Sequence, residues 1–272
     1  ADHLAGEHPQ LGGLHLQRVL GAIALLFLFR LGALGFFDPD EGRYAAVPSA
    51  MLRTGDFVVP CLQGFPYLEK PPLLYWLTAG ALAAFGRSEF AARLPVAVTG
   101  FIGVLAIFWL ALRARGARTA WLSAGLLALT MQWFVQSRFL TTDMVLAGCL
   151  TLGLCLFWRG VTTGLSRYYI LFYVCIALAT LSKGIIGFLL PGGIVFLFAL
   201  VTWRGPGKPG PRILREMQLP WGVPIFAAIV APWFVMVQVR IPQFMHYFII
   251  DQHVSRYASQ NAEHARPPWF FV

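Results

Sequence analysis

Two short charged stretches contain the residue types that could carry out chemistry. The first, DPDEGRY, covers residues 38–44, and the second, YLEKPP, covers residues 67–72. The first places three carboxylates and an arginine within six residues, although only 12% of the chain is charged. Carboxylates beside hydrocarbon are costly unless they are partnered or used in function. We therefore predict that these stretches hold a charged head group at the mouth of a membrane span.

The elements that position this site are predicted to be membrane-spanning helices. The chain has 272 residues, is 58% hydrophobic and has a mean hydropathy of +0.67. A helix rises about 1.5 Å per residue, so about 20 apolar residues cross about 30 Å of hydrocarbon. We expect an all-α polytopic membrane protein with about seven spans and the start of an eighth. The apolar runs cover residues 19–37, 94–112, 119–135, 144–158, 168–181, 185–203 and 219–239, and the eighth begins at residue 267.

Basic residues in the loops predict the orientation of the bundle. The loops 113–118, 159–167 and 204–216 hold three, two and four Lys or Arg residues and one acid, Glu216. Loops with an excess of Lys and Arg face the cytoplasm. All three loops do so only if the apolar segment 71–86 does not cross the membrane. We therefore predict that this segment forms a helix along the outer interface.

The same orientation divides the chain into a tail and one domain. Residues 1–18 form a cytoplasmic tail, and residues 19–272 form the transmembrane domain, with a first external loop at 38–93. Nine of the twelve Asp and Glu residues then lie outside. Arg30, near the middle of the first span, should face the bundle and find a partner there. A transporter more often places such groups in broken helices at mid-membrane depth, so the pattern favours a reaction chamber at the external surface.

The net charge of +9 does not indicate nucleic-acid binding, because the basic residues lie in short loops between spans. Anionic membrane lipids are the expected partners of such loops. The four cysteines have neither disulfide nor metal spacing, so we expect them to pack in the interior.

Five motifs follow one another along the chain. They are DEGRYA at 40–45, YLEKPPLLYW at 67–76, RLP at 93–95, TD at 142–143 and LSKG at 181–184. Together they resemble the membrane half of the polyprenyl-phosphate-dependent glycosyltransferases of the GT-C class. The resemblance is to the lipid A aminoarabinose transferases and the related protein O-mannosyltransferases, and it extends from about residue 19 to the C-terminal end.

This resemblance implies a bundle of about a dozen spans with juxtamembrane helices in the first external loop. The aminoarabinose branch adds a soluble domain after the last span, so we expect this chain to be a fragment. The implied location is the bacterial inner membrane, with the active site on the periplasmic side.

The implied reaction takes a sugar, 4-amino-4-deoxy-L-arabinose in the aminoarabinose branch, from a polyprenyl-phosphate donor to lipid A. A protein hydroxyl is the alternative acceptor. A transporter or flippase of lipid-linked sugars is the competing class, and it would predict paired inverted repeats, which we do not find in the sequence.

The donor phosphate needs cations near it, because negative charge develops on its oxygens as the bond to the sugar breaks. Arg43 offers a two-pronged donor and Lys70 a point charge. The alternative for Lys70 is a side chain that snorkels from an interfacial helix. The alternative for Arg43 is a local ion pair with Asp40 or Glu41.

Asp40 is the residue that the resemblance makes the catalytic carboxylate, and Asp143 a second one. A hydroxyl acceptor would need a base, whereas an ionised phosphate acceptor would mainly need positioning. The alternative for each is a role at a helix N-terminus. Asp38 and Glu41 suit that structural role better than Asp40 does.

The remaining candidates also come from the resemblance. Tyr44, Tyr67 and Lys183 would contact the donor phosphate or sugar, although tyrosines are common at membrane interfaces without any function. Glu69 and His253 would bind a divalent metal, zinc or magnesium, if one is present, because Glu and His suit zinc. For His253 the alternative is an ordinary interfacial histidine.

Overall fold

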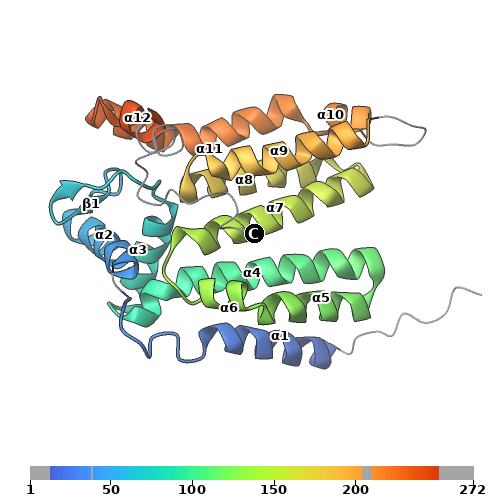
Figure 1. The fold of residues 1–272 in the computed structure, drawn as a ribbon, viewed down its shortest axis with the longest axis horizontal. Coiled ribbons are helices and arrows are strands. Elements are labelled where there is room, and N and C mark those ends of the chain that lie inside the picture. Colours follow the sequence, from blue (N-terminus) through green and yellow to red (C-terminus); the bar gives the residue numbers. More distant parts are fainter. Residues whose placement is uncertain (1–12, 38, 204–209, 251–272) are drawn as a thin grey trace, which may run out of the picture.

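The apolar runs of this chain fold almost entirely into helices. The computed structural model describes residues 13–37, 39–203 and 210–250 (Figure 1). In chain order the elements are α1 (Gly13–Leu28), α2 (Asp40–Thr54), β1 (Cys61–Leu62), β2 (Phe65–Pro66), α3 (Leu73–Phe85), α4 (Glu89–Arg115), α5 (Ala117–Leu129), α6 (Met131–Gln136), α7 (Thr142–Thr163), α8 (Ser166–Lys183), α9 (Ile186–Val201), α10 (Gly210–Glu216), α11 (Leu219–Arg240) and α12 (Phe244–His246).

The long helices coincide with most of the predicted spans. Within the described residues, α4, α7 and α11 are long and apolar enough to cross a membrane, and α9 is a shorter apolar helix. The predicted runs at 168–181 and 185–203 fall largely on α8 and α9. The predicted eighth span lies outside the described residues. These helices lie side by side and form the body of the molecule (Figure 1).

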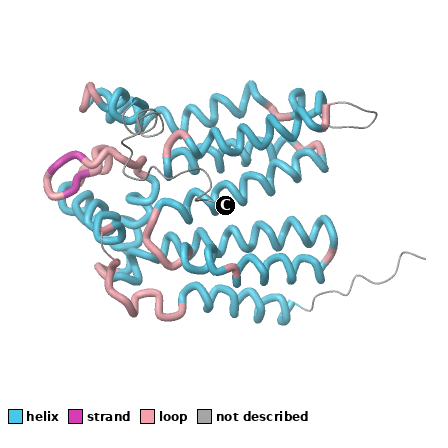
Figure 2. The backbone as a smooth tube through the Cα atoms, in the orientation of Figure 1, coloured by secondary structure: helices cyan, strands magenta, loops and turns pink. Residues whose placement is uncertain are grey.

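The prediction of a first span from residue 19 to residue 37 is wrong at both ends. The helix α1 begins at Gly13, inside the predicted tail, and ends at Leu28. Figure 2 shows the chain leaving α1 as a loop before α2 begins. Arg30 is exposed in this loop with a φ of 52°, so it does not face the bundle.

An arginine distant in sequence explains why α1 can stop early. Arg138 donates hydrogen bonds to the carbonyl oxygens of Leu26, Phe27 and Phe29 at 3.2, 2.9 and 2.7 Å. The last carbonyl groups of a helix have no partner within the helix. The guanidinium group therefore satisfies the carbonyls that a longer helix would have paired internally.

The predicted span at 119–135 is also interrupted. Thr130 is extended, with φ −60° and ψ 122°, and separates α5 from α6. After this break the Trp133 indole donates to the carbonyl of Gly100 at 3.2 Å, and its ring lies where a side chain on Gly103 would be. The break at Thr130 thus lets α6 pack on the glycines of α4, which a continuous helix over residues 119–135 would not do.

One end of the bundle carries a cap formed by α2, the hairpin β1–β2 and α3, with α12 at the same end (Figure 1). The helix α3 has 13 residues, or about 20 Å, which is shorter than the hydrocarbon core. It packs against α2 and α4, which agrees with the prediction that residues 71–86 do not cross. The basic connections α4–α5 and α7–α8 lie at the opposite end (Figure 1), as the loop charges predicted.

A buried ion pair fastens this cap to the bundle. Glu41 of α2 and Arg93 of α4 have side chains that are 0% and 3% exposed. The Arg93 guanidinium donates to both Glu41 oxygens, at 2.8 and 2.7 Å, and to the carbonyl oxygens of Leu31, Leu34 and Gly35 at 3.1, 2.7 and 2.9 Å. An arginine has five N–H donors, so none is left without a partner.

The Glu41 carboxylate accepts two further hydrogen bonds, from the backbone N–H groups of Phe37 at 3.0 Å and Leu140 at 2.7 Å. Burial alone would raise the pKa of this carboxyl group. The hydrogen bonds from Arg93, Phe37 and Leu140, together with the charge of Arg93, outweigh burial and hold the pKa below its ordinary value. Glu41 therefore stays charged. It lies in the first turn of α2, as expected of an acid at a helix N-terminus, and it also anchors that helix to Arg93.

Replacing Glu41 by Gln should strongly destabilise the fold, because Arg93 would stay buried without its anionic partner. Removing one member of a buried ion pair costs about 3 to 5 kcal/mol. Thermal unfolding of the purified protein in detergent should show a large fall in the midpoint. The matched control is Asp56→Asn, since Asp56 and Arg240 form an ion pair that is 38% and 50% exposed and should be worth less than about 1 kcal/mol. Equal losses in the two variants would contradict this account.

The same pair predicts a dependence of stability on acid. Because the folded-state pKa of Glu41 is lowered from 4.5, its stabilising contribution is fully present above the unfolded-state pKa and is lost as the pH falls through the folded-state pKa. The difference in unfolding midpoint between the natural protein and Glu41→Gln should therefore be constant from about pH 6 to 8 and shrink below the unfolded-state pKa. A difference that grows as the pH falls would have the wrong sign.

Candidate active site

The first turn of α2 places a carboxylate and a guanidinium group side by side. Asp40 and Arg43 form an ion pair, and their side chains are 52% and 37% exposed. The Arg43 Nε also donates to the carbonyl oxygen of Pro39 at 3.3 Å. The N-cap position belongs to Pro39, with no capping hydrogen bond from a side chain. The local ion pair considered for Arg43 is therefore confirmed, and both groups remain accessible from solvent.

A second ion pair joins two helices that are distant in sequence. Asp143 in the first turn of α7 pairs with Lys183 in the last turn of α8, 40 residues away. Next to it, the Ser182 hydroxyl donates to the carbonyl oxygen of Thr142 at 3.0 Å. Asp143 is therefore engaged by a specific cation as well as by the helix N-terminus, and 45% of its side chain is exposed.

Tyr44 lies between the two ion pairs. Burial, helped by the charges of Asp40 and Asp143, raises the pKa of Tyr44 to about 12, whereas a hydrogen bond with Thr142 and the charge of Arg43 act to lower it. An interaction with groups from both pairs requires the start of α2 and the start of α7 to be close. The structure therefore gathers Asp40, Arg43, Tyr44, Asp143 and Lys183, as predicted, at the capped end of the bundle.

The loop before α3 adds a tyrosine and a carboxylate. The Tyr67 hydroxyl donates to Glu69 Oε2 at 3.1 Å. Burial, then the charge of Glu69, raises the pKa of Tyr67 well above its ordinary value. The charges of Tyr67 and Glu69 both act to raise the pKa of Arg43. This loop therefore faces the first turn of α2. Lys70 follows Glu69 in the same loop and is half-buried.

Tyr75 lies beside this site, in the segment 71–86 for which the sequence predicted only an interfacial helix. Its ring stacks on that of Tyr44 at 6.1 Å, and the side chain is fully buried. Its hydroxyl has no hydrogen-bond partner among the described residues. A buried hydroxyl is normally hydrogen-bonded, so this one is an exception within the described residues, and its ring supports that of Tyr44 from the interior. The signal in the sequence was its position in the YLEKPPLLYW motif.

The predicted metal site is only partly described. Glu69 accepts the hydrogen bond from Tyr67, whereas His253 lies outside the described residues, as does Asp38. No group of three or more His, Cys, Asp and Glu residues that could hold a metal occurs within the described part of the chain. A divalent metal at Glu69 and His253 stays a prediction.

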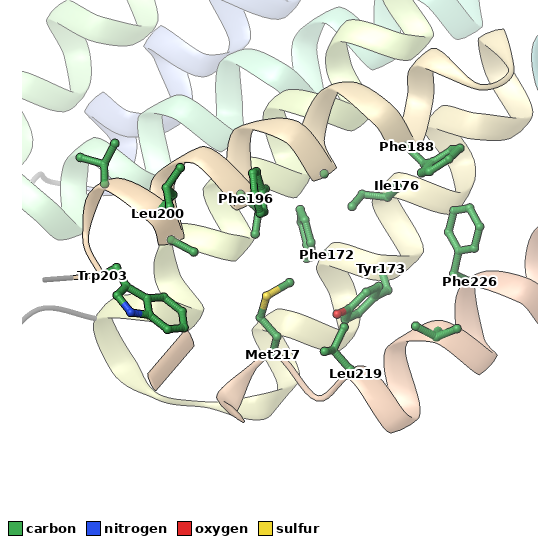
Figure 3. Close-up of a pocket in the computed structure, with 15 residues that line it drawn as sticks. Phe172, Tyr173, Ile176, Phe188, Phe196, Leu200, Trp203, Met217, Leu219 and Phe226 are labelled. Atoms are coloured by element: carbon green, nitrogen blue, oxygen red, sulfur yellow. The ribbon is translucent and has the colours of Figure 1, made fainter. Parts of the chain in front are cut away.

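A cavity of about 890 Å³, separate from the site, lies between α8, α9 and the first two turns of α11 (Figure 3). Aromatic and aliphatic side chains point into it, among them Phe172, Phe196 and Trp203 (Figure 3). None of its lining residues carries a charge. It can accommodate apolar groups but offers no acid, base or cation for catalysis.

Comparisons with curated proteins give relatives with one shared name, undecaprenyl phosphate-alpha-4-amino-4-deoxy-L-arabinose arabinosyl transferase. The relative from Pseudomonas savastanoi pathovar phaseolicola is 30% identical over 261 residues, which cover 93% of this chain and 47% of the relative. The relative from Pseudomonas aeruginosa strain UCBPP-PA14 is 31% identical, with 93% and 46% covered. The chain thus spans about half the length of the curated relatives it matches.

Two solved structures of a similarly described protein have the same fold over most of this chain. ArnT from Cupriavidus metallidurans bound to undecaprenyl phosphate is similar with a TM-score of 0.82 and 32% identity, over 90% of this chain and 45% of that one. Its apo state gives a TM-score of 0.81. The family model described as dolichyl-phosphate-mannose-protein mannosyltransferase matches residues 22–248. With this match over most of the bundle, the chain belongs to the dolichyl-phosphate-mannose-protein mannosyltransferase family, a family of GT-C glycosyltransferases.

Proposed function

We propose that the protein transfers a sugar, 4-amino-4-deoxy-L-arabinose, from a polyprenyl-phosphate donor to lipid A at the external face of the inner membrane. The names of the curated relatives support the donor. The observation that carries the proposal is the convergence of the pairs Asp40–Arg43 and Asp143–Lys183 on Tyr44. This convergence lies at the end of the bundle opposite the basic loops, where a lipid-linked phosphate can enter from the outer leaflet.

In the proposed reaction an acceptor oxygen attacks the anomeric carbon, and the bond from that carbon to the phosphate oxygen breaks. The electron pair of the broken bond stays on the leaving polyprenyl phosphate. Arg43, Lys70 and Lys183 are the cations available to stabilise the negative charge that builds up there. Each of the half-exposed pairs in the site holds its cation in place until the phosphate arrives and competes with the carboxylate.

The role of Asp40 depends on the acceptor. A phosphate group of lipid A arrives already ionised, so Asp40 would orient the acceptor or the amino sugar and no proton need be removed. With a hydroxyl acceptor, Asp40 would take the proton as the new bond forms. Tyr44 and Tyr67 supply hydroxyl groups and ring faces that suit a sugar, and the buried Tyr75 supports the ring of Tyr44.

Two other functions would use the same chain differently. The description of the family model names protein mannosyltransferases, which favours a protein hydroxyl as the second candidate acceptor. A transporter of lipid-linked sugars would need charged groups at mid-membrane depth. In the described residues the ion pairs of the site instead lie at helix ends, which favours an enzyme.

Asp40→Asn should lower transfer by about a hundredfold or more while leaving membrane insertion intact, because it removes the carboxylate that orients the acceptor or takes its proton. Lys70→Ala should lower transfer through a loss of charge stabilisation at the donor phosphate. The assay follows label from radiolabelled polyprenyl-phosphate sugars into lipid A or protein, with the intact protein in lipid. Asp56→Asn, an acid paired with Arg240 at 2.8 Å, is the matched control. Full activity of Asp40→Asn and Lys70→Ala would refute the site.

Exchanging the charges of the second pair separates its chemical role from its structural one. Lys183→Met should reduce transfer by about tenfold or more, because it removes one charge-assisted contact with the phosphate. The double variant Asp143→Lys with Lys183→Asp keeps the link between α7 and α8 but moves the cation to the other helix. We expect this variant to unfold at a normal temperature yet remain impaired in transfer. Recovery of full activity would mean that the pair only joins the two helices.

A further inference from the structure

The end of the bundle opposite the proposed active site contains two arginines stacked on aromatic rings. Arg159, near the end of α7, has its guanidinium carbon 5.8 Å from the ring centre of Trp109 and 5.9 Å from that of Tyr168. Arg167, in the first turn of α8, lies 5.1 Å from the ring centre of Tyr168. We call these four residues the basic aromatic cluster. It joins α4, α7 and α8 at the α7–α8 connection.

No carboxylate neutralises this cluster within the described part of the chain. The described ion pairs do not include Arg159 or Arg167. Glu216, the acid of the three basic loops, pairs with Arg212. The Nε of Arg159 is buried and has no hydrogen-bond partner there either. Arg167 also lies at a helix N-terminus, where the helix dipole disfavours a cation. A bound anion would offset the unneutralised charge of the two arginines and the unfavourable position of Arg167 at the helix N-terminus.

The surroundings of the cluster indicate which anion. Tryptophan and tyrosine are enriched at the level of lipid head groups, and the basic loops place this end at the cytoplasmic surface. Two exposed apolar side chains flank the arginines in sequence, Trp158 with 41% and Leu165 with 44% of its surface accessible. A soluble ion gains nothing from such neighbours, whereas a lipid can cover them with its acyl chains.

We propose that the basic aromatic cluster binds the phosphate of an anionic phospholipid of the cytoplasmic leaflet. Guanidinium groups match the geometry of phosphate oxygens and form charge-assisted hydrogen bonds with them. The rings of Trp109 and Tyr168 hold the two guanidinium groups in place, so less side-chain freedom is lost on binding. The site is independent of the proposed transfer reaction, because it uses none of the residues assigned to that reaction.

The test uses the full chain in nanodiscs of phosphatidylcholine with increasing mole fractions of phosphatidylglycerol, and it follows the thermal unfolding midpoint. We expect phosphatidylglycerol to raise the midpoint in a saturable way. Each of Arg159→Gln and Arg167→Gln should increase the mole fraction needed for half the effect by about fivefold. The matched control is Arg212→Gln, since Arg212 is engaged by Glu216, and it should retain the natural response.

Three outcomes would overturn the proposal. The first is an unchanged phosphatidylglycerol response in the double variant Arg159→Gln with Arg167→Gln. The second is an equal loss of response in Arg212→Gln, which would mean only general attraction to a charged surface. The third is a full response to inorganic phosphate in neutral nanodiscs, which would mean a soluble anion. If the double variant does not fold, the exposed residue Arg167 provides a single variant that decides the same question.

Discussion

The buried ion pair between Glu41 and Arg93 holds the two segments that carry Asp40 and Asp143. This pair connects α2 to α4, to the loop after α1 and to the backbone N–H of Leu140 just before α7. Desolvating two charges is expensive, and complete hydrogen bonding is what offsets the cost. The arrangement therefore contributes a unique geometry more than net stability. It fixes the first turn of α2 at the end of the bundle where the second ion pair lies.

Neighbouring acids in the DPDEGRY stretch have opposite environments because of helix geometry. Glu41 is fully buried, whereas the Asp40 side chain is 52% exposed. Successive residues of a helix point about 100° apart, so one can anchor α2 while the other stays in contact with solvent. The same segment thus provides both the anchor of the cap and the accessible carboxylate of the site, and the anchor limits how far the carboxylate can move.

The sequence allowed the membrane class, most helices, the position of the basic connections at one end of the bundle and the grouping of most described candidate residues to be predicted. These features depend on local runs of apolar residues, on the charges of short loops and on motifs. It did not reveal the role of Glu41, because its partner Arg93 is 52 residues away. The early end of α1 was missed for the same reason. Apolar composition continues beyond Leu28, and only contacts with Arg93 and Arg138 explain the change in backbone conformation.

The capping of α1 by Arg138 has a consequence for how the protein is made. The carbonyl groups of Leu26, Phe27 and Phe29 precede their partner by 112, 111 and 109 residues. Synthesis at about 5 to 20 residues per second leaves these groups without that partner for several seconds after α1 has entered the membrane. The outer end of the first helix therefore acquires its final form only when α6 and the turn after it have been inserted. The end of α1 therefore cannot reach its final conformation before Arg138 has been synthesised.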